Sequence, residues 1–346
     1  MGTCAILSFR LGMTDGVSVV AELWRQALER LGWETTTVAG EGPVDHLVPG
    51  LAIDATRPPS PADLDRAIGA CDLVIVENLL SIPMNLAAST VVIDALAGRP
   101  AILHHHDPPW QRARFAHITL LPPDHPAWAH VTINRLTERQ FADRELTATT
   151  IYNGFDLDPP PGRRDRTRAL LDVGAGDRLV VHPVRAIARK NIPSALRLCE
   201  ALDAAYWIPG RAEEGYGDEF ERLLAATSAR VIRHPVDRTD VTMSDLYAAS
   251  DLVAFPSTWE GFGNPPIEAA IHLRPAAVGH YPVADELRAL GFHWLDPEDH
   301  PAVAAELAAP SEGALADNRR LVEQHLSTER MEADIARLLE SRGWRP

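Results

Sequence analysis

The sequence is nearly devoid of lysine. Of its 33 basic Lys and Arg residues only Lys190 is a lysine, so the other 32 are arginine. Codon bias explains arginine elsewhere and makes this one exception informative. Lys190 lies in HPVRAIARKNIPSAL (182–196), together with Arg185 and Arg189. Three cations in so short a segment of a chain with a net charge of -15 indicate a site for a small anionic ligand.

The chain also lacks an excess of basic charge, long apolar runs and closely spaced cysteines. Its acidic balance argues against nucleic acid or an anionic membrane surface as a partner. No apolar run reaches the roughly 18 residues of a membrane span, and the start does not resemble a signal peptide, so we expect a cytoplasmic protein without an integral membrane segment. Cys4, Cys71 and Cys199 lie far apart, which excludes a local zinc motif and fits reduced thiols.

Short apolar runs alternate with helical patterns along the chain. Apolar residues recur three and four positions apart within 19–33, which predicts an amphipathic helix. Near-continuous apolar runs between such patterns are typical of buried parallel strands. We expect strands in 4–9, 71–78, 101–106, 131–134, 148–153, 178–184, 204–210, 229–236 and 251–257. This alternation predicts an α/β fold with parallel sheets.

The segment DLDPPPGRRDR (156–166) interrupts this alternation and is rich in proline and charge, as a linker would be. We therefore expect two Rossmann-like domains, residues 1–157 and residues 158–326, that face a cleft. The C-terminal helix at about 327–346 is expected to pack back on the first domain. Ligands of open parallel sheets bind beyond the C-terminal ends of the strands, where Arg185 and Lys190 are expected.

A second motif, FPSTWEGFGNPPIEAAIHLRPA (255–276), combines a strand end, a glycine loop and a helix that opens with two prolines. The free N–H groups and the dipole at such a helix start bind phosphate. Glu260 and Glu268 flank this helix start with seven residues between them. We expect Glu260 in the loop and Glu268 in the first helical turn. Carboxylates at these places are suitable acceptors for sugar or ribose hydroxyls.

Together these motifs resemble retaining glycosyltransferase family four, whose members have the GT-B fold of two Rossmann-like domains. Glu260 to Glu268 is similar to the E-x7-E signature of that family, and RAIARKN (185–191) to its diphosphate-binding Arg and Lys. IYNGFD (151–156) resembles its Asn-Gly-x-Asp motif, and DGVS (15–18) its N-terminal glycine loop. FRLGMTDGVS, VENLLSIPMN, HHHDPPWQRARF and PVRAIARKN more narrowly resemble a subgroup that includes mannosylglucosylglycerate synthases.

This resemblance implies retaining transfer of a hexose from a GDP- or UDP-linked sugar, with no cofactor required and no metal. The acceptor hydroxyl would belong to a small soluble molecule such as a glycerate glycoside. Arg185 and Lys190 would stabilise the leaving diphosphate, while Glu260 would contact the donor sugar and Glu268 the ribose. The other donor-binding residues would be Gly16, Gly210, Phe262, Gly263 and Asn264. Loops 208–211 and 232–238 would lie against the base. Neighbouring residues on a loop or helix rarely share a face, so we expect Arg189 to point away from Lys190.

Three histidines and Asp107 end the strand in AILHHHDPPW (101–110). Side chains of a strand alternate between its faces, so only His104 and His106 would point together, and no His-x-x-x-His partner is present; we expect no metal there. The family resemblance instead implies that one histidine contacts the donor sugar near the reacting carbon, His106 first and His105 second. Acceptor-binding candidates are Asp15, Asn78, His105 and Asp107, with Asn85 on the same loops.

Several other functions fit the sequence less well than a glycosyltransferase does. A pyridoxal-type phosphorylase needs a Schiff-base lysine, for which only Lys190 is available. Metal-dependent transferases use Asp-x-Asp, but DLD at 63–65 and 156–158 falls in polar connections. The glycines of 172–180 precede a strand, where a dinucleotide loop would follow one. A GT-B epimerase and a non-catalytic nucleotide-sugar-binding protein remain as alternatives, and the sequence leaves the oligomeric state open.

Overall fold

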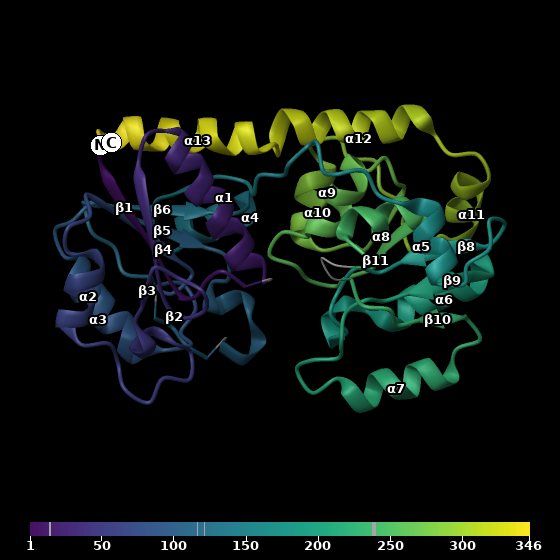
Figure 1. Ribbon diagram of the computed structural model, residues 1–346, viewed down its shortest axis with the longest axis horizontal. Helices are drawn as coiled ribbons and strands as arrows, with labels where there is room; N and C mark the ends of the chain where they lie inside the picture. Colours follow the sequence, from purple (N-terminus) through teal and green to yellow (C-terminus); the bar gives the residue numbers. More distant parts are fainter. Residues whose placement is uncertain (14, 116, 121, 237–239) are drawn as a thin grey trace. The chain divides into compact units, whose positions relative to one another are not determined.

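The computed structural model describes residues 1–346 except residues 14, 116, 121 and 237–239. The described chain divides into two compact units (Figure 1). Unit 1 comprises Met1–Gly154 and Leu326–Pro346, and unit 2 comprises Phe155–His325. Each unit is built around a parallel sheet with intervening helices, as the sequence predicts. None of the described helices is long and apolar enough to span a membrane.

Unit 1 contains a seven-stranded parallel sheet in the order β3-β2-β1-β4-β5-β6-β7 within the described residues. Its strands are β1 (Thr3–Arg10), β2 (Glu34–Glu41), β3 (His46–Leu47), β4 (Leu73–Glu77), β5 (Ala101–His105), β6 (Trp128–Thr132) and β7 (Ala148–Thr150). The expectation from the sequence included β1 and β4 to β7 but not β2 and β3. β2 escaped notice because its first half, ETTT, is polar and only its second half is buried.

Helices cover both faces of this sheet. They are α1 (Gly16–Arg30), α2 (Pro61–Ile68), α3 (Leu86–Leu96), α4 (Arg135–Ala142) and α13 (Thr328–Arg342). Alternate residues of β1 face opposite ways, so Ile6 packs with Trp24 of α1 and Ile335 of α13, while Leu7 packs with residues of α2 and α3. The long N-terminal helix predicted from its apolar spacing is therefore α1.

Unit 2 has a five-stranded parallel sheet in the order β10-β9-β8-β11-β12 within the described residues. Its strands are β8 (Arg178–Val181), β9 (Ala204–Trp207), β10 (Val231–Ile232), β11 (Leu252–Phe255) and β12 (Ala276–Val278). Its helices are α5 (Arg164–Leu170), α6 (Ile192–Leu202), α7 (Gly217–Ala226), α8 (Met243–Ala249), α9 (Asn264–Ile271), α10 (Pro282–Arg288), α11 (His300–Ala308) and α12 (Glu312–His325).

The C-terminal end of the chain forms two helices, α12 and α13. Ser327 caps α13 by accepting a hydrogen bond from the Arg330 N–H, and this cap separates α13 from α12. α12 packs against α9 of unit 2, while α13 packs against α1 of unit 1.

Strand order fixes where a ligand fits in each unit. In both sheets the chain winds one way from a central strand and then the other way, which leaves a switch point between β1 and β4 in unit 1 and between β8 and β11 in unit 2. Ligands of doubly wound sheets bind beyond the C-terminal ends of the strands at such points. The loops that follow β1, β4, β8 and β11 are therefore the candidate ligand-binding segments.

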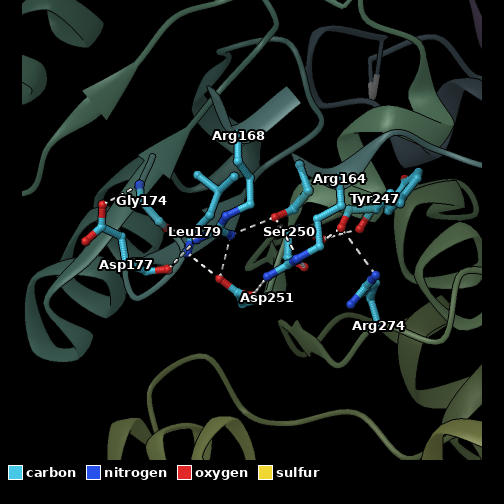
Figure 2. A network of polar contacts seen from close by, with 11 residues as sticks. Arg164, Arg168, Gly174, Asp177, Leu179, Tyr247, Ser250, Asp251 and Arg274 are labelled. Atoms are coloured by element: carbon cyan, nitrogen blue, oxygen red, sulfur yellow. Dashed lines mark hydrogen bonds and ion pairs between the residues drawn. The ribbon is translucent and has the colours of Figure 1, made fainter. Parts of the chain in front are cut away.

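A polar network stabilises the opposite end of the unit 2 sheet (Figure 2). The Asp251 carboxylate accepts hydrogen bonds from Arg164 Nη2 at 2.6 Å, Arg168 Nη1 at 3.1 Å and the Leu179 N–H at 2.8 Å. Arg168 also donates to the carbonyl oxygens of Gly174 and Asp177. Since Arg168 is buried and Asp251 precedes β11, one carboxylate joins α5 to the starts of β8 and β11.

Candidate functional site

Beyond the end of β8, one carboxylate is shared by two cations. Glu260 accepts a hydrogen bond from Lys190 Nζ at 2.6 Å through Oε1 and forms an ion pair with Arg189 through Oε2. Lys190 and Glu260 are 9% and 6% exposed, so the contact is nearly removed from water. The expectation that Arg189 points away is wrong. Residues 188–190 form a 3-10 turn that turns both neighbours toward Glu260.

Burial and the neighbouring charges both act on the pKa of Lys190. Burial lowers the pKa of Lys190 from its usual value, the Glu260 carboxylate opposes this, and the charges of Arg189 and Arg185 lower it further. Two cations and one carboxylate leave one positive charge in a nearly dry place. Such a charge favours an incoming anion, because electrostatic attraction is stronger where water is excluded.

Arg185 lies on the exposed rim of the cluster. Its guanidinium donates a hydrogen bond to Glu213 at 2.6 Å, and both side chains are about half exposed. The neighbouring loop requires glycine, because a Cβ atom on Gly210 would lie 2.0 Å from the Val184 carbonyl oxygen and 2.7 Å from Arg185 Cα. Gly210 thus allows loop 208–211 to approach the segment that carries Arg185. The other loop expected to contact the base is 232–238, of which residues 237 and 238 lie outside the described residues.

The loop before α9 is shaped by Gly263. This residue has φ +102, and a Cβ atom there would lie 2.3 Å from the Tyr281 hydroxyl, so both backbone and packing call for glycine. Phe262 is buried, Asn264 is the first residue of α9, and two prolines follow, as predicted. Pro265 and Pro266 carry no N–H, so Asn264 and Ile267 carry the N–H groups of the first turn.

Glu268 lies in the second turn of α9, not in the first turn as expected. The Tyr247 hydroxyl donates a hydrogen bond to Glu268 Oε2, and the Tyr247 ring stacks on His272 with centroids 4.9 Å apart. Burial raises the pKa of Glu268 above its usual range, although the Tyr247 hydrogen bond opposes this. Tyr247 therefore orients the carboxylate that the sequence assigns to ribose binding.

Two polar side chains at the unit 2 switch point were not singled out from the sequence. His182 follows β8 and donates or accepts through Nδ1 at 2.9 Å from the Tyr206 hydroxyl, while its Nε2 has no partner among the described residues. Ser257 follows β11, and its buried hydroxyl likewise has no partner there. Burial and the Lys190 charge lower the pKa of His182 to about 3, so it is neutral at pH 7. Their positions just after adjacent strands could have drawn attention to them.

In unit 1, the first loop ends in a helix cap. Asp15 caps α1 by accepting hydrogen bonds from the Ser18 N–H at 3.3 Å and the Ser18 hydroxyl at 3.0 Å, and it pairs with Arg10 at 3.3 Å. Gly16 is the first residue of α1, and a Cβ atom there would meet no described heavy atom within 4 Å. Packing within the described protein thus does not require glycine at residue 16.

Asn78 organises the end of β5. It adopts φ +60, and its side-chain oxygen accepts hydrogen bonds from the backbone N–H groups of His106 at 3.2 Å and Asp107 at 3.0 Å. Asp107 in turn pairs with Arg112 and remains partly exposed. The unit 1 switch point therefore brings Asn78, His106 and Asp107 together, while Asn85 lies apart as the cap of α3.

Glu77, which the sequence did not single out, lies between His104 and His106. Its carboxylate is 3.0 Å from His104 Nδ1 and 2.7 Å from His106 Nε2, and all three residues are buried. Although burial acts to raise it, the pKa of Glu77 is held below its usual value by the two imidazoles. His104 and His106 do point together, as strand alternation predicts.

Among the described residues, these three side chains form a group that could hold a metal ion, since their donor atoms lie within 4.8 Å of one another. Their present contacts satisfy the carboxylate through imidazole hydrogen bonds. His104 Nε2 is buried with no partner among the described residues. Metal-binding histidines almost always donate this second ring N–H to an outer partner, so the donor set fits a hydrogen-bonded cluster better than a metal centre.

His105 points to the other face of β5. It is fully buried and lies 2.6 Å from the Ser81 hydroxyl and 2.9 Å from His130. The two candidate histidines thus differ in environment: His106 is held by Glu77 near the loop of Asn78, whereas His105 reaches that loop only through Ser81.

Comparison with known proteins gives relatives along most of the chain. No protein-family model matches the sequence. The chain is 24% identical to the mannosylglucosylglycerate synthase of Petrotoga mobilis, over 83% of this chain and 84% of that protein. It is 23% identical to the mannosylglucosylglycerate synthase of Thermotoga maritima, over 81% of each.

Solved structures give the fold. The chain is similar to HepE from Anabaena in complex with UDP-glucose, with a TM-score of 0.71, 19% identity and coverage of 98% of this chain and 99% of that one. This similarity confirms the expected GT-B fold class. The chain is therefore a GT-B protein that resembles glycosyltransferase family four, with mannosylglucosylglycerate synthases among its relatives.

Proposed function

We propose that the chain transfers a hexose from a nucleoside-diphosphate sugar to a hydroxyl of a small acceptor, with retention of configuration and without a metal. The observation that carries this proposal is the cluster of Arg189 with the buried Lys190 and Glu260 at the unit 2 switch point. Its net positive charge and the start of α9 on the same loop suit a diphosphate. The names of the relatives and the UDP-glucose bound by HepE support a nucleotide-sugar donor.

In the proposed donor complex, the diphosphate competes with Glu260 for Lys190. As the glycosidic bond breaks, negative charge grows on the bridging oxygen, and Lys190 supplies a compact ammonium that follows it. Arg185 leaves its exposed contact with Glu213 for a second phosphate oxygen. Glu260, released from Lys190, then accepts hydrogen bonds from donor-sugar hydroxyls.

The remaining donor contacts follow from the same loops. The backbone N–H groups of Phe262, Gly263 and Asn264 face the phosphate or the sugar, and Glu268 accepts from the ribose hydroxyls. Loop 208–211, brought close by Gly210, lies against the base. Gly16 lets the first loop of unit 1 approach the diphosphate.

Unit 1 supplies the acceptor contacts in this proposal. Asp107 accepts hydrogen bonds from acceptor hydroxyls, the Asn78 amide group donates to them, and Asp15 accepts from the first loop. Glu77 accepts from His106 Nε2–H, which leaves His106 Nδ1 as the ring atom available to the donor sugar. Because the acceptor oxygen enters on the face that the leaving group vacates, no protein nucleophile is required.

A nucleoside diphosphate or its sugar should stabilise the protein against thermal unfolding. GDP, UDP and their sugars are added without metal, and the melting temperature of the protein is followed against concentration. One base should raise it, because a ligand at 100 times its dissociation constant stabilises the folded state by about 2.7 kcal/mol. If none of these ligands raises the melting temperature, with or without Mg²⁺ and with or without EDTA, the proposal is contradicted. A shift without turnover on any acceptor would favour a non-catalytic binding protein.

Glu268→Ala should weaken nucleotide binding with little change in turnover at saturating donor. The loss of hydrogen bonds from ribose hydroxyls to a charged acceptor is worth about 1.5–3 kcal/mol, or roughly 10- to 100-fold in the dissociation constant. Calorimetric titration with the nucleoside diphosphate measures it. Glu268→Gln, which keeps an acceptor for Tyr247, serves as the milder control. Equal affinity of wild type and Glu268→Ala would show that the ribose is recognised elsewhere.

A further inference from the structure

A chain of four hydrogen-bonded side chains crosses unit 1 from its surface to the loop after β4. Asp124 Oδ1 lies 3.3 Å from His130 Nε2, and His130 Nδ1 lies 2.9 Å from His105 Nε2. His105 Nδ1 then lies 2.6 Å from the Ser81 hydroxyl. The two imidazole rings are stacked with centroids 5.2 Å apart. Each ring uses both of its nitrogens, so the chain is continuous.

The carboxylate at one end dictates the direction of every hydrogen bond. An ionised carboxylate only accepts, so His130 Nε2 must carry a proton. A neutral imidazole has one N–H, so His130 Nδ1 accepts from His105 Nε2–H. His105 Nδ1 must then accept from the hydroxyl of Ser81. A carboxylate fixes the tautomer of a catalytic histidine in serine hydrolases in the same way, here through two rings instead of one.

Burial keeps both rings neutral, as this direction requires. His105 is fully buried, and burial together with the charges of His130, His104 and His106 holds the pKa of His105 well below its usual value. Burial also lowers the pKa of His130, against the effect of Asp124 and with that of Arg342. These are the charged and titratable groups that bear on the two rings from the sheet, the loop before β6 and α13.

The two ends differ from the middle in their access to water. The Asp124 side chain is 59% exposed and opens into a surface hollow of about 260 Å³, whose lining includes His130 and Arg342. Ser81 retains 7% exposure on the loop that also carries Asn78. The Ser81 O–H donates to His105, so the lone pairs of Ser81 Oγ are left to accept from another hydroxyl.

We propose that Ser81 is a catalytic residue of the transfer reaction, and that His105, His130 and Asp124 form a proton relay behind it. The proposal rests on the proposed function, since the hydroxyl that donates to Ser81 Oγ is that of the acceptor. As the acceptor oxygen forms its bond to the sugar carbon, its proton passes to Ser81 Oγ and the Ser81 proton passes to His105 Nδ1. His105 Nε2–H then protonates His130 Nδ1, and His130 Nε2–H protonates Asp124, which releases the proton to water.

The relay gives His105 a role that its position does not otherwise allow. Its ring is fully buried, so it contacts no substrate directly. Through Ser81 it nevertheless increases the nucleophilicity of the acceptor oxygen. Proton transfer by the protein also leaves the departing diphosphate oxygen free to keep its contact with Lys190.

Ser81→Ala tests the catalytic role. We expect turnover to fall about 100-fold, the lower end for loss of a general base, while nucleotide binding by thermal shift stays at the wild-type level. Ser89→Ala is the matched control, because Ser89 is a buried serine of the neighbouring helix α3 whose hydroxyl bonds only backbone carbonyls in the described structure. Ser81→Ala with wild-type turnover and intact nucleotide binding would overturn the relay and leave the proposed function standing.

The ring nitrogens provide a readout that needs no activity. ¹⁵N NMR of the histidine rings of the wild-type protein at pH 7.5 should show His105 and His130 each protonated at Nε2 and bare at Nδ1. In Asp124→Asn this preference should weaken for both rings, and turnover should fall with a changed pH profile. A proton on Nδ1 of either ring in the wild type would overturn the relay. Absence of nucleotide binding together with the expected tautomers would instead contradict only the proposed function.

Discussion

Lys190→Ala is expected to lower turnover by about 100- to 1,000-fold, the usual cost of losing one electrostatic contact to developing charge. Lys190 is the nearly buried partner of Glu260, so its ammonium acts where water screens it poorly. The measurement is the turnover number at saturating donor and acceptor, with the dissociation constant of the nucleoside diphosphate alongside it. Both should worsen, and turnover should worsen more, because negative charge is greater in the transition state than in the bound donor.

Two further variants show whether the effect belongs to the ammonium. Lys190→Arg keeps the charge but replaces a compact group by a planar fork, so it should recover only part of the lost turnover. Arg185→Ala removes an exposed cation and should cost less than Lys190→Ala. In Lys190→Ala the Glu260 carboxylate retains Arg189, so the protein should still fold. Turnover of Lys190→Ala within a few-fold of wild type would remove Lys190 from the mechanism.

Asp251→Ala should destabilise unit 2 by about 3 kcal/mol, the lower end for removing one partner of a buried ion pair, because about a quarter of the Asp251 side chain is exposed. The substitution leaves Arg168 buried without its carboxylate and frees the Leu179 N–H at the start of β8 (Figure 2). Native-state hydrogen exchange of the β8 and β11 amides measures the loss within unit 2. Asp158→Ala, which removes only an exposed ion pair with Arg319, should stay within about 1 kcal/mol of wild type.

The cost of Asp251→Ala should depend on pH in a defined direction. Burial acts to raise the pKa of Asp251, but Arg164, the Leu179 N–H and Arg168 together hold it below its usual value. A carboxyl with a lowered folded-state pKa stabilises the protein fully above its ordinary pKa of about 3.9 and loses that contribution as pH falls through the folded-state pKa. The difference between wild type and variant should therefore be constant near neutral pH and shrink below about pH 4. A difference that grows on acidification would contradict the network.

The architecture could be predicted from the sequence because it rests on local patterns. Apolar runs such as 73–77 and 252–255 are long enough to mark buried strands, and proline and glycine before α9 mark its start. The E-x7-E and Arg…Lys spacings then point to the fold that the comparisons confirm. The strands that the sequence did not indicate are β2, β3 and β12: β2 begins with a polar half, β3 has only two residues, both exposed, and β12 has only three residues.

Side-chain partners across long sequence separations were harder to predict. Arg189 turns inward because a 3-10 turn places it and Lys190 on one carboxylate seventy residues away, a geometry that spacing along the chain does not encode. Glu77 is the last residue of β4, and its position along the chain gives no sign that His104 and His106 lie beside it. His105 depends on His130 of the next strand. Such contacts follow from register, which a single sequence does not give.

The division of unit 1 into two segments has a consequence for its synthesis. Residues 155–325 leave the ribosome between the unit 1 sheet and α13, a delay of roughly ten to thirty seconds at typical translation rates. During that delay the apolar cluster that packs Met331, Ile335 and Leu338 lacks α13, although α1 already lies on the same sheet face. Unit 2, a single continuous segment, has all of its own strands and helices before α13 is made. The nascent chain therefore carries a complete second unit and a first unit whose apolar face is only partly covered, the kind of surface that a chaperone binds.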